Sequence, residues 1–472
     1  MGSRSLSGVA WGLAAALAWG VALATTYTVD DDGPADFASI QSAINAATTG
    51  DQIVVKPGRY HETLSFLGKS ITVRSEKGPA ATVVYLEGQT RIVQLDGDAT
   101  LQGFTITGGR QRVGGGILVT GGANPIIEDN VIEGNTAAYN DATGFPGLGG
   151  GIAIEAPCEP VITRNVIRGN QALASAAGLY GYGAAIAVDD GATAVITSNV
   201  IVGNASGQIG GAIYVGVAGT TSPVVITNNT ISGNQAGGSS PDTSSYGGGI
   251  SLYDGAVATV QNNAIDANSA AYSGGGIYFF ASNTTGLDYK NNDFDGNLPD
   301  NCAGLPSSKC NGSQLFLAPL YQDAAGGNYR LRSDSPLVDK GVTGSQGTLD
   351  ADGRARNRDG DLNGTALPDV GAFENQGELT RLTFDSATAL HWDGSANASM
   401  VFDAYRSALS TLAPGPIGAC WHAGLTSPST TDAQALAPGE GFFYLVGGRA
   451  TVRGSLGFDG QGAERTPQTA CP

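Results

Sequence analysis

One stretch of the chain, residues 114–297, repeats itself and therefore constrains the fold more than any other feature. Each copy begins with a cluster of small residues followed by Ile, and each ends with two Asn residues five positions apart. The clusters end at Ile117, Ile152, Ile186, Ile213, Ile250 and Ile277, and the pairs are Asn130/Asn135, Asn165/Asn170, Asn199/Asn204, Asn229/Asn234, Asn263/Asn268 and Asn292/Asn297. Self-similarity of this kind indicates a solenoid, in which each copy packs on its neighbours.

The spacing divides each copy into a nearly fixed half and a variable half. From Ile to the first Asn the distance is 13 residues in four copies and 15 or 16 in the others. From the second Asn to the next Ile it varies between 9 and 17 residues. The shortest unit is too short for a βαβ unit of roughly 30 residues, and no helical pattern is present. We therefore expect short strands joined by tight turns, wound into a parallel β-helix, with the insertions in loops.

The repeated Asn residues are expected inside this coil. In the copy at 160–170, Asn165 interrupts an otherwise apolar row that contains Ile162 and Ile167. Stacked copies would place Asn over Asn, and the amides could then form a ladder of hydrogen bonds. Such a ladder satisfies polar groups whose burial would otherwise be costly. The hypothesis predicts that Asn165, Asn199 and Asn263 stack in line.

Three further regions flank the repeats. Residues 1–24 have the features of a secretory signal peptide, with Arg4, an apolar run at 9–21 and a small-residue cleavage site at 22–24. That apolar run is too short for a membrane-spanning helix of about 20 residues. Residues 37–47 show helical spacing, with Ser39 as N-cap, and a helix there would cover the open end of the solenoid. Residues 376–472 alternate between apolar and turn residues, which is typical of a small β-sandwich.

Two N-terminal segments carry a family resemblance. The run DFASIQSAINAATTGDQIVVKPGRY at 36–60 and the run GFTITGG at 103–109 resemble secreted right-handed β-helix proteins of the pectate-lyase-like superfamily. The resemblance covers about residues 26–375 and implies an all-β fold, a right-handed parallel β-helix over 25–375. The resemblance says little about function, because members of the superfamily include lyases, hydrolases, epimerases, esterases and non-catalytic surface proteins. Residues 335–341 and 350–374 are similar to the end segment of surface-associated bacterial members.

Cysteine usage fits an exported protein. Cys302 and Cys310 flank a short loop, where we expect a disulfide. Cys420 and Cys471 could tie down the end of the C-terminal domain. Cys158 remains inside a coil, where a small buried apolar residue is the simplest interpretation.

Charge narrows the choice of partners. The net charge is −18, and only 14% of the residues are charged. An acidic chain lacks the basic patches with which proteins bind nucleic acids and anionic membranes. Solubility is the simplest consequence of this acidity.

The residues needed for catalysis are scarce in the repeats. β-Elimination on an acidic sugar needs a base, and often a cation that neutralises the carboxylate. Residues 114–297 offer only Arg164, Arg168 and Lys290 as basic side chains, and solvated salt bridges are the alternative role for them. Hydrolysis needs two carboxylates roughly 5–10 Å apart. Asp189 and Asp190 are adjacent, so on a strand they would face opposite ways, and a turn is the alternative.

Histidine gives no better candidate. None lies between residues 62 and 390, and His61 stands beside Glu62 in the N-terminal region, where a capping role is the simpler account.

A calcium loop is the candidate metal site. Asp359, Asp361 and Asn363 place oxygen ligands at alternate positions, and Gly364 is the sixth residue of the motif. Asp369 falls at the eleventh position, although the motif has an acid at the twelfth. Asp350 and Asp352 lie nearby in sequence. A structural calcium ion is the cofactor that this pattern predicts.

Aromatic residues in the inserted loops are the candidate binding site. They are Tyr139, Phe145, Tyr180, Tyr182, Tyr246 and Tyr272. Aromatic rings stack on the apolar faces of sugars, although these rings could instead pack on one another. The resulting hypothesis is a secreted or surface protein that binds extracellular polysaccharide without turnover. Two alternatives remain open, namely a polysaccharide lyase that acts on acidic glycans and a structural or adhesive stalk.

Overall fold

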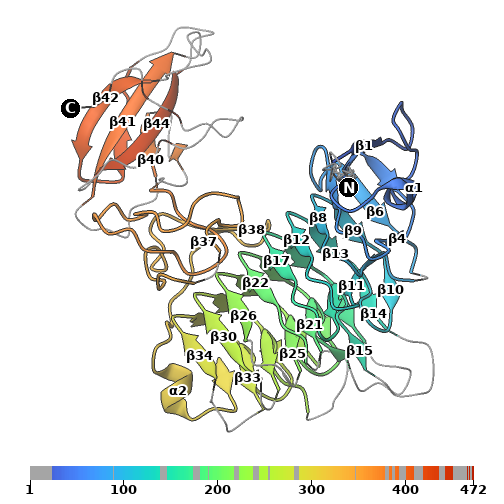
Figure 1. The fold of residues 1–472 in the computed structure, drawn as a ribbon. Coiled ribbons are helices and arrows are strands. Elements are labelled where there is room, and N and C mark those ends of the chain that lie inside the picture. Colours follow the sequence, from blue (N-terminus) through green and yellow to red (C-terminus); the bar gives the residue numbers. More distant parts are fainter. Residues whose placement is uncertain are drawn as a thin grey trace, which may run out of the picture.

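The repeats form coils whose strands stack into long parallel sheets, which Figure 1 shows in a computed structural model. The structure describes residues 24–88, 90–138, 146–173, 181–189, 191–216, 223–237, 244–253, 256–280, 286–345, 347–377, 382–384, 388–392, 400–408, 418–434, 442–449, 456, 465, 467 and 470–471. The expected signal peptide at 1–24 therefore lies almost entirely outside the described residues.

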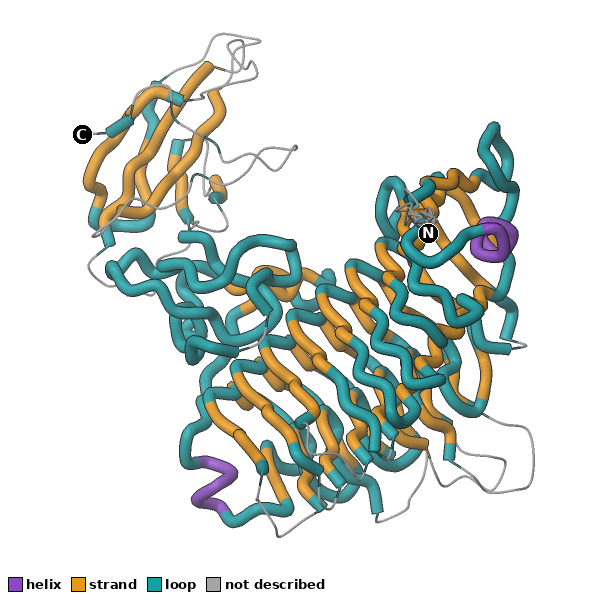
Figure 2. The backbone as a smooth tube through the Cα atoms, in the orientation of Figure 1, coloured by secondary structure: helices purple, strands orange, loops and turns teal. Residues whose placement is uncertain are grey.

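Each coil passes through up to four parallel sheets, which we name A, B, C and D (Figure 2). Sheet A contains β1 (Thr26–Val29), β2 (Gln52–Val55), β5 (Thr72–Ser75), β8 (Thr100–Gln102), β12 (Ile126–Glu128), β17 (Val161–Thr163), β22 (Val195–Thr197), β26 (Val224–Thr227), β30 (Ala258–Gln261) and β34 (Leu287–Lys290). Sheet B contains β3 (Gly58–Tyr60), β6 (Thr82–Tyr85), β9 (Thr105–Thr107), β13 (Val131–Glu133), β18 (Val166–Arg168), β23 (Val200–Val202), β27 (Thr230–Ser232), β31 (Ala264–Asp266) and β35 (Asp293–Asp295).

The other two sheets complete the coil. Sheet C contains β4 (Leu64–Ser65), β7 (Val93–Leu95), β11 (Ile117–Val119), β16 (Ile152–Ile154), β21 (Ile186–Val188), β25 (Ile213–Val215), β29 (Ile250–Leu252), β33 (Ile277–Phe279) and β36 (Cys302–Ala303). Sheet D contains β10 (Arg110–Gln111), β14 (Thr136–Ala137), β19 (Gln171–Ala172), β24 (Ala205–Ser206), β28 (Gln235–Ala236) and β32 (Ser269–Ala270), and β15 (Gly147–Leu148) pairs with β20 (Gly181–Tyr182). The repeated Ile residues lie in register above one another and are fully buried.

The Asn pairs form two ladders at the corners on either side of sheet B. In the first ladder, the Asn165 amide donates to the Asn199 side-chain oxygen at 3.0 Å, and Asn199 donates to Asn229 at 3.1 Å. Asn229 then donates to Asn263 at 3.0 Å, so the predicted stack is confirmed, and the ladder also includes Asn229, Asn130 and Asn292. The second ladder runs through Asn135, Asn170, Asn204, Asn234, Asn268 and Asn297.

The glycines of each repeat allow the rungs to approach closely. The first glycine of the cluster has positive φ, as at Gly149 with φ 63°. A Cβ on the second, Gly150, would lie 2.3 Å from the Gln171 carbonyl oxygen. Backbone packing this tight explains why only small residues occupy these positions.

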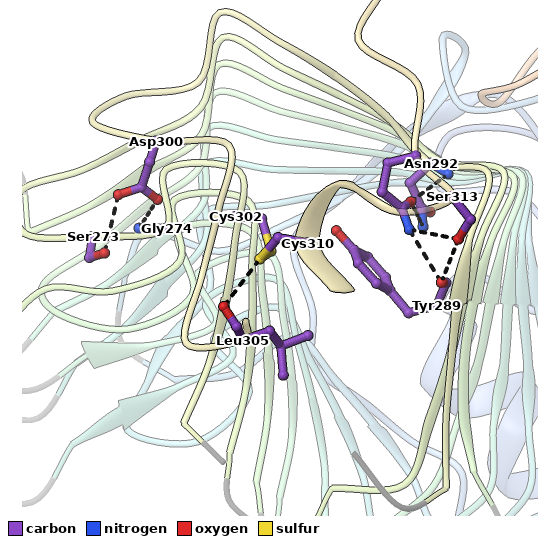
Figure 3. The surroundings of a disulfide bond; sticks show 10 residues. Ser273, Gly274, Tyr289, Asn292, Asp300, Cys302, Leu305, Cys310 and Ser313 are labelled. Atoms are coloured by element: carbon purple, nitrogen blue, oxygen red, sulfur yellow. Dashed lines mark hydrogen bonds between the residues drawn. A yellow bond between two sulfur atoms is a disulfide. The ribbon is translucent and has the colours of Figure 1, made fainter. Parts of the chain in front are cut away.

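Both ends of the solenoid are covered. At the N-terminal end, α1 (Ile40–Ala46) buries Ile40 and Ile44, and Ser39 caps it as predicted. Glu62, rather than His61, completes the cap by accepting from the Ile40 and Gln41 backbone N–H groups. At the other end lies α2 (Ser307–Asn311), next to the Cys302–Cys310 disulfide (Figure 3).

The remaining cysteines also agree with the sequence analysis. A second disulfide joins Cys420 to Cys471 in the C-terminal domain. Cys158 is a free thiol and is fully buried.

Residues 313–377, which we call the closing segment, fold back over the corner between sheets A and B. The segment contains the antiparallel pair β37 (Tyr321–Asp323) and β38 (Asn328–Leu331). Its contacts proceed along successive rungs, from Lys340 on Asn291 to Val342 on Asn262 and Leu349 on Ser198. The segment therefore runs back toward the N-terminal coils, a course that no local pattern indicated.

The C-terminal domain consists of two antiparallel sheets beyond the closing segment (Figure 1). One contains β39 (Thr383–Phe384), β40 (Ala389–His391) and β43 (Ser429–Thr431), and the other contains β41 (Val401–Ala408), β42 (Ala419–Leu425) and β44 (Phe442–Arg449). Leu390 and Trp392 from one side pack with Phe402 from the other in a single core cluster. This arrangement agrees with the small β domain expected over 376–472.

Candidate functional site

The outer surface of sheet C carries a continuous cluster of aromatic rings, which we call the aromatic face. It comprises Tyr182, Tyr214, Tyr246, Tyr253, Tyr272, Tyr278 and Phe280. Tyr214 and Tyr278 point outward because they alternate with inward-facing Ile213 and Ile277 along their strands. The face therefore spans several rungs of the solenoid.

The rings of this face pack on one another, with a few left open to solvent. Tyr246 lies 4.4 Å from Tyr278 and 5.2 Å from Tyr272, measured between ring centroids. Burial raises the pKa of the Tyr278 hydroxyl. Tyr272 remains 53% exposed and Tyr253 38% exposed. Both alternatives for the loop aromatics therefore apply. Most rings pack on one another, and the rings of Tyr253 and Tyr272 are exposed to solvent.

Only part of the predicted aromatic set can be placed. Tyr182, Tyr246 and Tyr272 belong to the aromatic face, whereas Tyr139, Phe145 and Tyr180 lie outside the described residues. The sequence analysis missed four members, Tyr214, Tyr253, Tyr278 and Phe280. The period-two alternation after each Gly-Ile cluster could have identified Tyr214 and Tyr278, since the residue after the inward Ile must face outward.

All three candidate bases of the repeats are held in ion pairs. The Arg164 guanidinium lies 2.6 Å from Glu128 and 2.8 Å from Asp129, and its side chain is 14% exposed. Hydrogen bonding to Asp129 raises the pKa of Arg164 still further above its ordinary value. A group that holds its proton this firmly is poorly suited to remove one from a substrate.

The other two pairs are more open. Arg168 lies 2.6 Å from Glu133 and Lys290 lies 3.2 Å from Asp288, and both cations are about half exposed, at 54% and 42%. Of the adjacent acids proposed for hydrolysis, Asp189 directly follows β21, and Asp190 lies outside the described residues.

A groove of about 610 Å³ crosses the outer side of sheet B. Its floor is a row of exposed glycines at the second corner of each coil, Gly134, Gly169, Gly203 and Gly233. Thr107, Glu133, Arg168, Val202 and Ser232 line it from successive strands, and Tyr329 of the closing segment forms one end. The groove lies on a different sheet from the aromatic face.

A buried acid stands behind the end of this groove. The Asp266 carboxylate accepts from the Tyr321 hydroxyl at 2.6 Å and from the Ser232 hydroxyl at 2.7 Å. Burial raises the pKa of Asp266 to about 6. Both of its oxygens are engaged within the protein, so the carboxylate fixes Ser232 and the closing segment in place.

The calcium hypothesis is modified by the structure. Carboxylate oxygens of Asp339, Asp359 and Asp361 lie within 4.8 Å of one another. Asp359 and Asp361 were predicted, whereas Asp339 comes from a distant part of the sequence and only the fold brings it there. Burial and these two neighbouring acids raise the pKa of Asp339 to about 7. A cation at this position would relieve that repulsion, so the donor set fits calcium.

Two predicted ligands have other roles in the structure. The Asp369 oxygens accept from the backbone N–H groups of Asp339, at 2.8 Å, and Asn375, at 2.6 Å. Asp369 is fully buried in a separate network that includes Glu374. Asn363 donates its side-chain amide to Asp361, and its side-chain oxygen accepts from the Thr365 backbone N–H. The structure therefore does not bring Asp369 to the acid cluster.

Comparisons with known proteins agree with the coils. The family model for the right handed beta helix region matches residues 87–222. The coils therefore form a right-handed parallel β-helix. Among solved structures, pectate lyase Pel9A is similar with a TM-score of 0.44 and 15% identity over 75% of this chain and 98% of that chain. None of the curated proteins that were compared matches the chain. At this identity no residue role passes from Pel9A to this protein.

Among the described residues, no helix combines the length and the apolar character that crossing a membrane would require.

Proposed function

We propose that the protein is exported and binds extracellular polysaccharide through the aromatic face, without turnover. The observation that carries the proposal is the pair of exposed rings, Tyr253 and Tyr272, supported from behind by packed aromatic neighbours. Rings that are held in place lose little conformational freedom when a sugar stacks on them. The ion pairs of Arg164, Arg168 and Lys290 favour binding over elimination, because each cation already has an acidic partner.

Retention of the protein on immobilised polysaccharides tests this proposal. The double variant Tyr253→Ala/Tyr272→Ala should be retained roughly tenfold more weakly, since each ring contributes about 0.5–1.5 kcal/mol. Tyr85→Ala is the matched control, because Tyr85 lies on sheet B and contacts His61 instead. An ultraviolet assay for unsaturated sugar ends should show no product. Steady product release from a polyuronate, abolished by Arg168→Ala or Lys290→Ala, would establish a lyase instead.

We further propose that calcium binds to Asp339, Asp359 and Asp361 and acts as a structural ion. It would hold residues 359–364 against the rest of the closing segment, as the convergence of the three carboxylates suggests. The ion would lie outside both the aromatic face and the groove. Its role is therefore independent of the proposed glycan binding, and removal of the ion by a chelator should lower the melting temperature.

A further inference from the structure

We infer that the groove over sheet B is a second saccharide site, and that it accepts a neutral glycan segment rather than a polyuronate. This site lies on another face of the solenoid than the aromatic face, so either site could exist without the other. The volume of about 610 Å³ falls within the range of ordinary ligand sites, roughly 300–1,000 Å³.

The shape of the groove suits an extended, regularly repeating ligand. Its lining residues come from β9, β13, β18, β23 and β27, which are successive strands of sheet B. Neighbouring strands lie roughly 4.8 Å apart, so the lining spans roughly 19 Å along the solenoid axis. The spacing between neighbouring strands is close to the length of one pyranose residue in an extended glycan. The glycine floor allows such a chain to lie close to the backbone, because a side chain at Gly169, Gly203 or Gly233 would project into open space.

The groove offers polar groups to sugar hydroxyls along its length. Arg168 donates its Nε to Glu133 and is 54% exposed, so its terminal amino groups remain available to a ligand oxygen. Ser232 is buried, donates its proton to Asp266 and bonds with Tyr329. The acceptor for a sugar is therefore Thr107, whose hydroxyl lines the other end of the groove. Tyr329 supplies an aromatic ring at the Ser232 end. Donor, acceptor and ring together match the mixed polar and apolar surface of a sugar.

The charges select against an acidic glycan. Arg168 is the one cation among the described residues that line the groove, and Glu133 already neutralises it at 2.6 Å. Asp266 adds a buried acid behind Ser232, and Asp295 follows on the next strand, in register with Asp266. A uronate carboxylate would therefore meet acids and no unpaired cation, and its desolvation would not be offset.

Isothermal titration with cellohexaose, xylohexaose and a galacturonic acid hexamer tests this inference. The blocking variant is Gly203→Asn, because Asn tolerates the positive φ of 63° and would project its side chain into the groove. The matched control is Gly296→Asn, a residue with φ 61° and open space in the same row but outside the groove. Melting temperatures confirm that both variants fold.

We expect at least one neutral hexasaccharide to bind, and to bind at least tenfold more weakly to Gly203→Asn but normally to Gly296→Asn. The Tyr253→Ala/Tyr272→Ala variant should retain this binding, which separates the groove from the aromatic face. Binding of neither neutral hexasaccharide at millimolar concentration would overturn the inference. Equal binding to both Asn variants, or a preference for the galacturonic acid hexamer, would also overturn it.

Discussion

The coils and the closing segment satisfy their buried polar groups in opposite ways. In the coils the buried polar groups are chiefly neutral amides, and each Asn bonds to its copy in the next rung, as Asn199 does with Asn165 and Asn229. In the closing segment they are carboxylates that accept backbone N–H groups. Asp350 accepts from Asp352, Arg354 and Glu374, and Asp369 accepts from Asp339 and Asn375.

This difference follows from repetition. A periodic chain places the same amide at the same height in every rung, so donors and acceptors match without any charge. The closing segment has no period, and a carboxylate with several acceptor sites is better able to gather irregularly placed N–H groups. The consequence is that burial raises the pKa of Asp350, Asp369 and Glu374. The closing segment, together with the coil acids Asp266 and Asp293 that bond to it, should therefore respond to charge, pH and cations, whereas the rest of the coils should not.

The largest effect is expected from Arg356→Ala. The Arg356 guanidinium is buried and donates to the Gly371 and Ala372 carbonyl oxygens, with Glu374 at 3.6 Å. Removing it leaves buried carboxylates without their cation, which typically costs about 3–5 kcal/mol. Hydrogen exchange should show a loss of amide protection in residues 335–375, while the amides of the coils stay protected. Lys290→Ala, which removes an exposed pair, is the control and should cost less than about 1 kcal/mol. Equal loss of protection in the coils would contradict the proposed independence of the two regions.

The substitution Asn199→Leu in the first ladder is expected to lower the free energy of unfolding by about 1–3 kcal/mol. That change leaves the backbone N–H of Asn165 without its acceptor and removes the amide contact between the rungs. Asn130→Leu at the start of the first ladder should cost less, because the Asn130 oxygen accepts only from the Phe104 backbone N–H among the described residues. Urea unfolding of both variants measures the difference. If the two substitutions cost the same, the rungs do not support one another.

The sequence predicted the coils well because one interaction is copied many times. The Ile and Asn spacing was enough to predict the solenoid and the Asn165, Asn199 and Asn263 stack. Local patterns also predicted the N-terminal helix, which begins at Ile40 and ends at Ala46 in the structure. In each case the partners follow from local spacing or from a fixed period, so pattern alone identifies them.

The site could be predicted only in part, because its contacts cross the sequence without any period. Asp339 lies 20 residues before Asp359 and reaches it only through the folding of the closing segment. Asp369 fits the spacing of a ligand, yet the fold buries it beside Glu374 and outside the cluster of Asp339, Asp359 and Asp361. The sheet B groove depends on Tyr329 meeting the Gly233 corner, which no motif encodes. Tertiary contacts of this kind decide which spaced residues become a site.

A pH titration should next test the contact between the two regions. Burial raises the pKa of Asp293 to about 7 and that of Asp266 to about 6, and each carboxylate accepts a hydrogen bond from the closing segment. The folded chain thus keeps these protons at a pH where the unfolded chain has lost them. Raising the pH from about 4 to 7 should therefore reduce the free energy of unfolding, by roughly 2–3 kcal/mol per group.

Asp293→Asn provides the control for that titration. The neutral amide should remove the part of the pH slope that Asp293 contributes, while the ladder variants should keep the slope of the unmodified protein. Melting temperatures at several pH values measure the pH dependence of stability in each variant. Stability that rises with pH across this window would contradict the assignment.

The smallest expected effect is the response to calcium. Chelator should lower the melting temperature by about 1–2 °C, which corresponds to roughly 1 kcal/mol of ion binding in a chain of this size. Asp361→Ala should abolish the response, because Asp361 belongs to the acid cluster with Asp339 and Asp359. Asp352→Ala is the control, since Asp352 pairs with Arg330 and lies outside the cluster. Bound calcium should also displace the proton that Asp339 retains up to about pH 7, so the pH slope should become shallower when calcium is added. An unchanged melting temperature and pH slope in the presence of chelator would mean that these acids hold the closing segment without a metal.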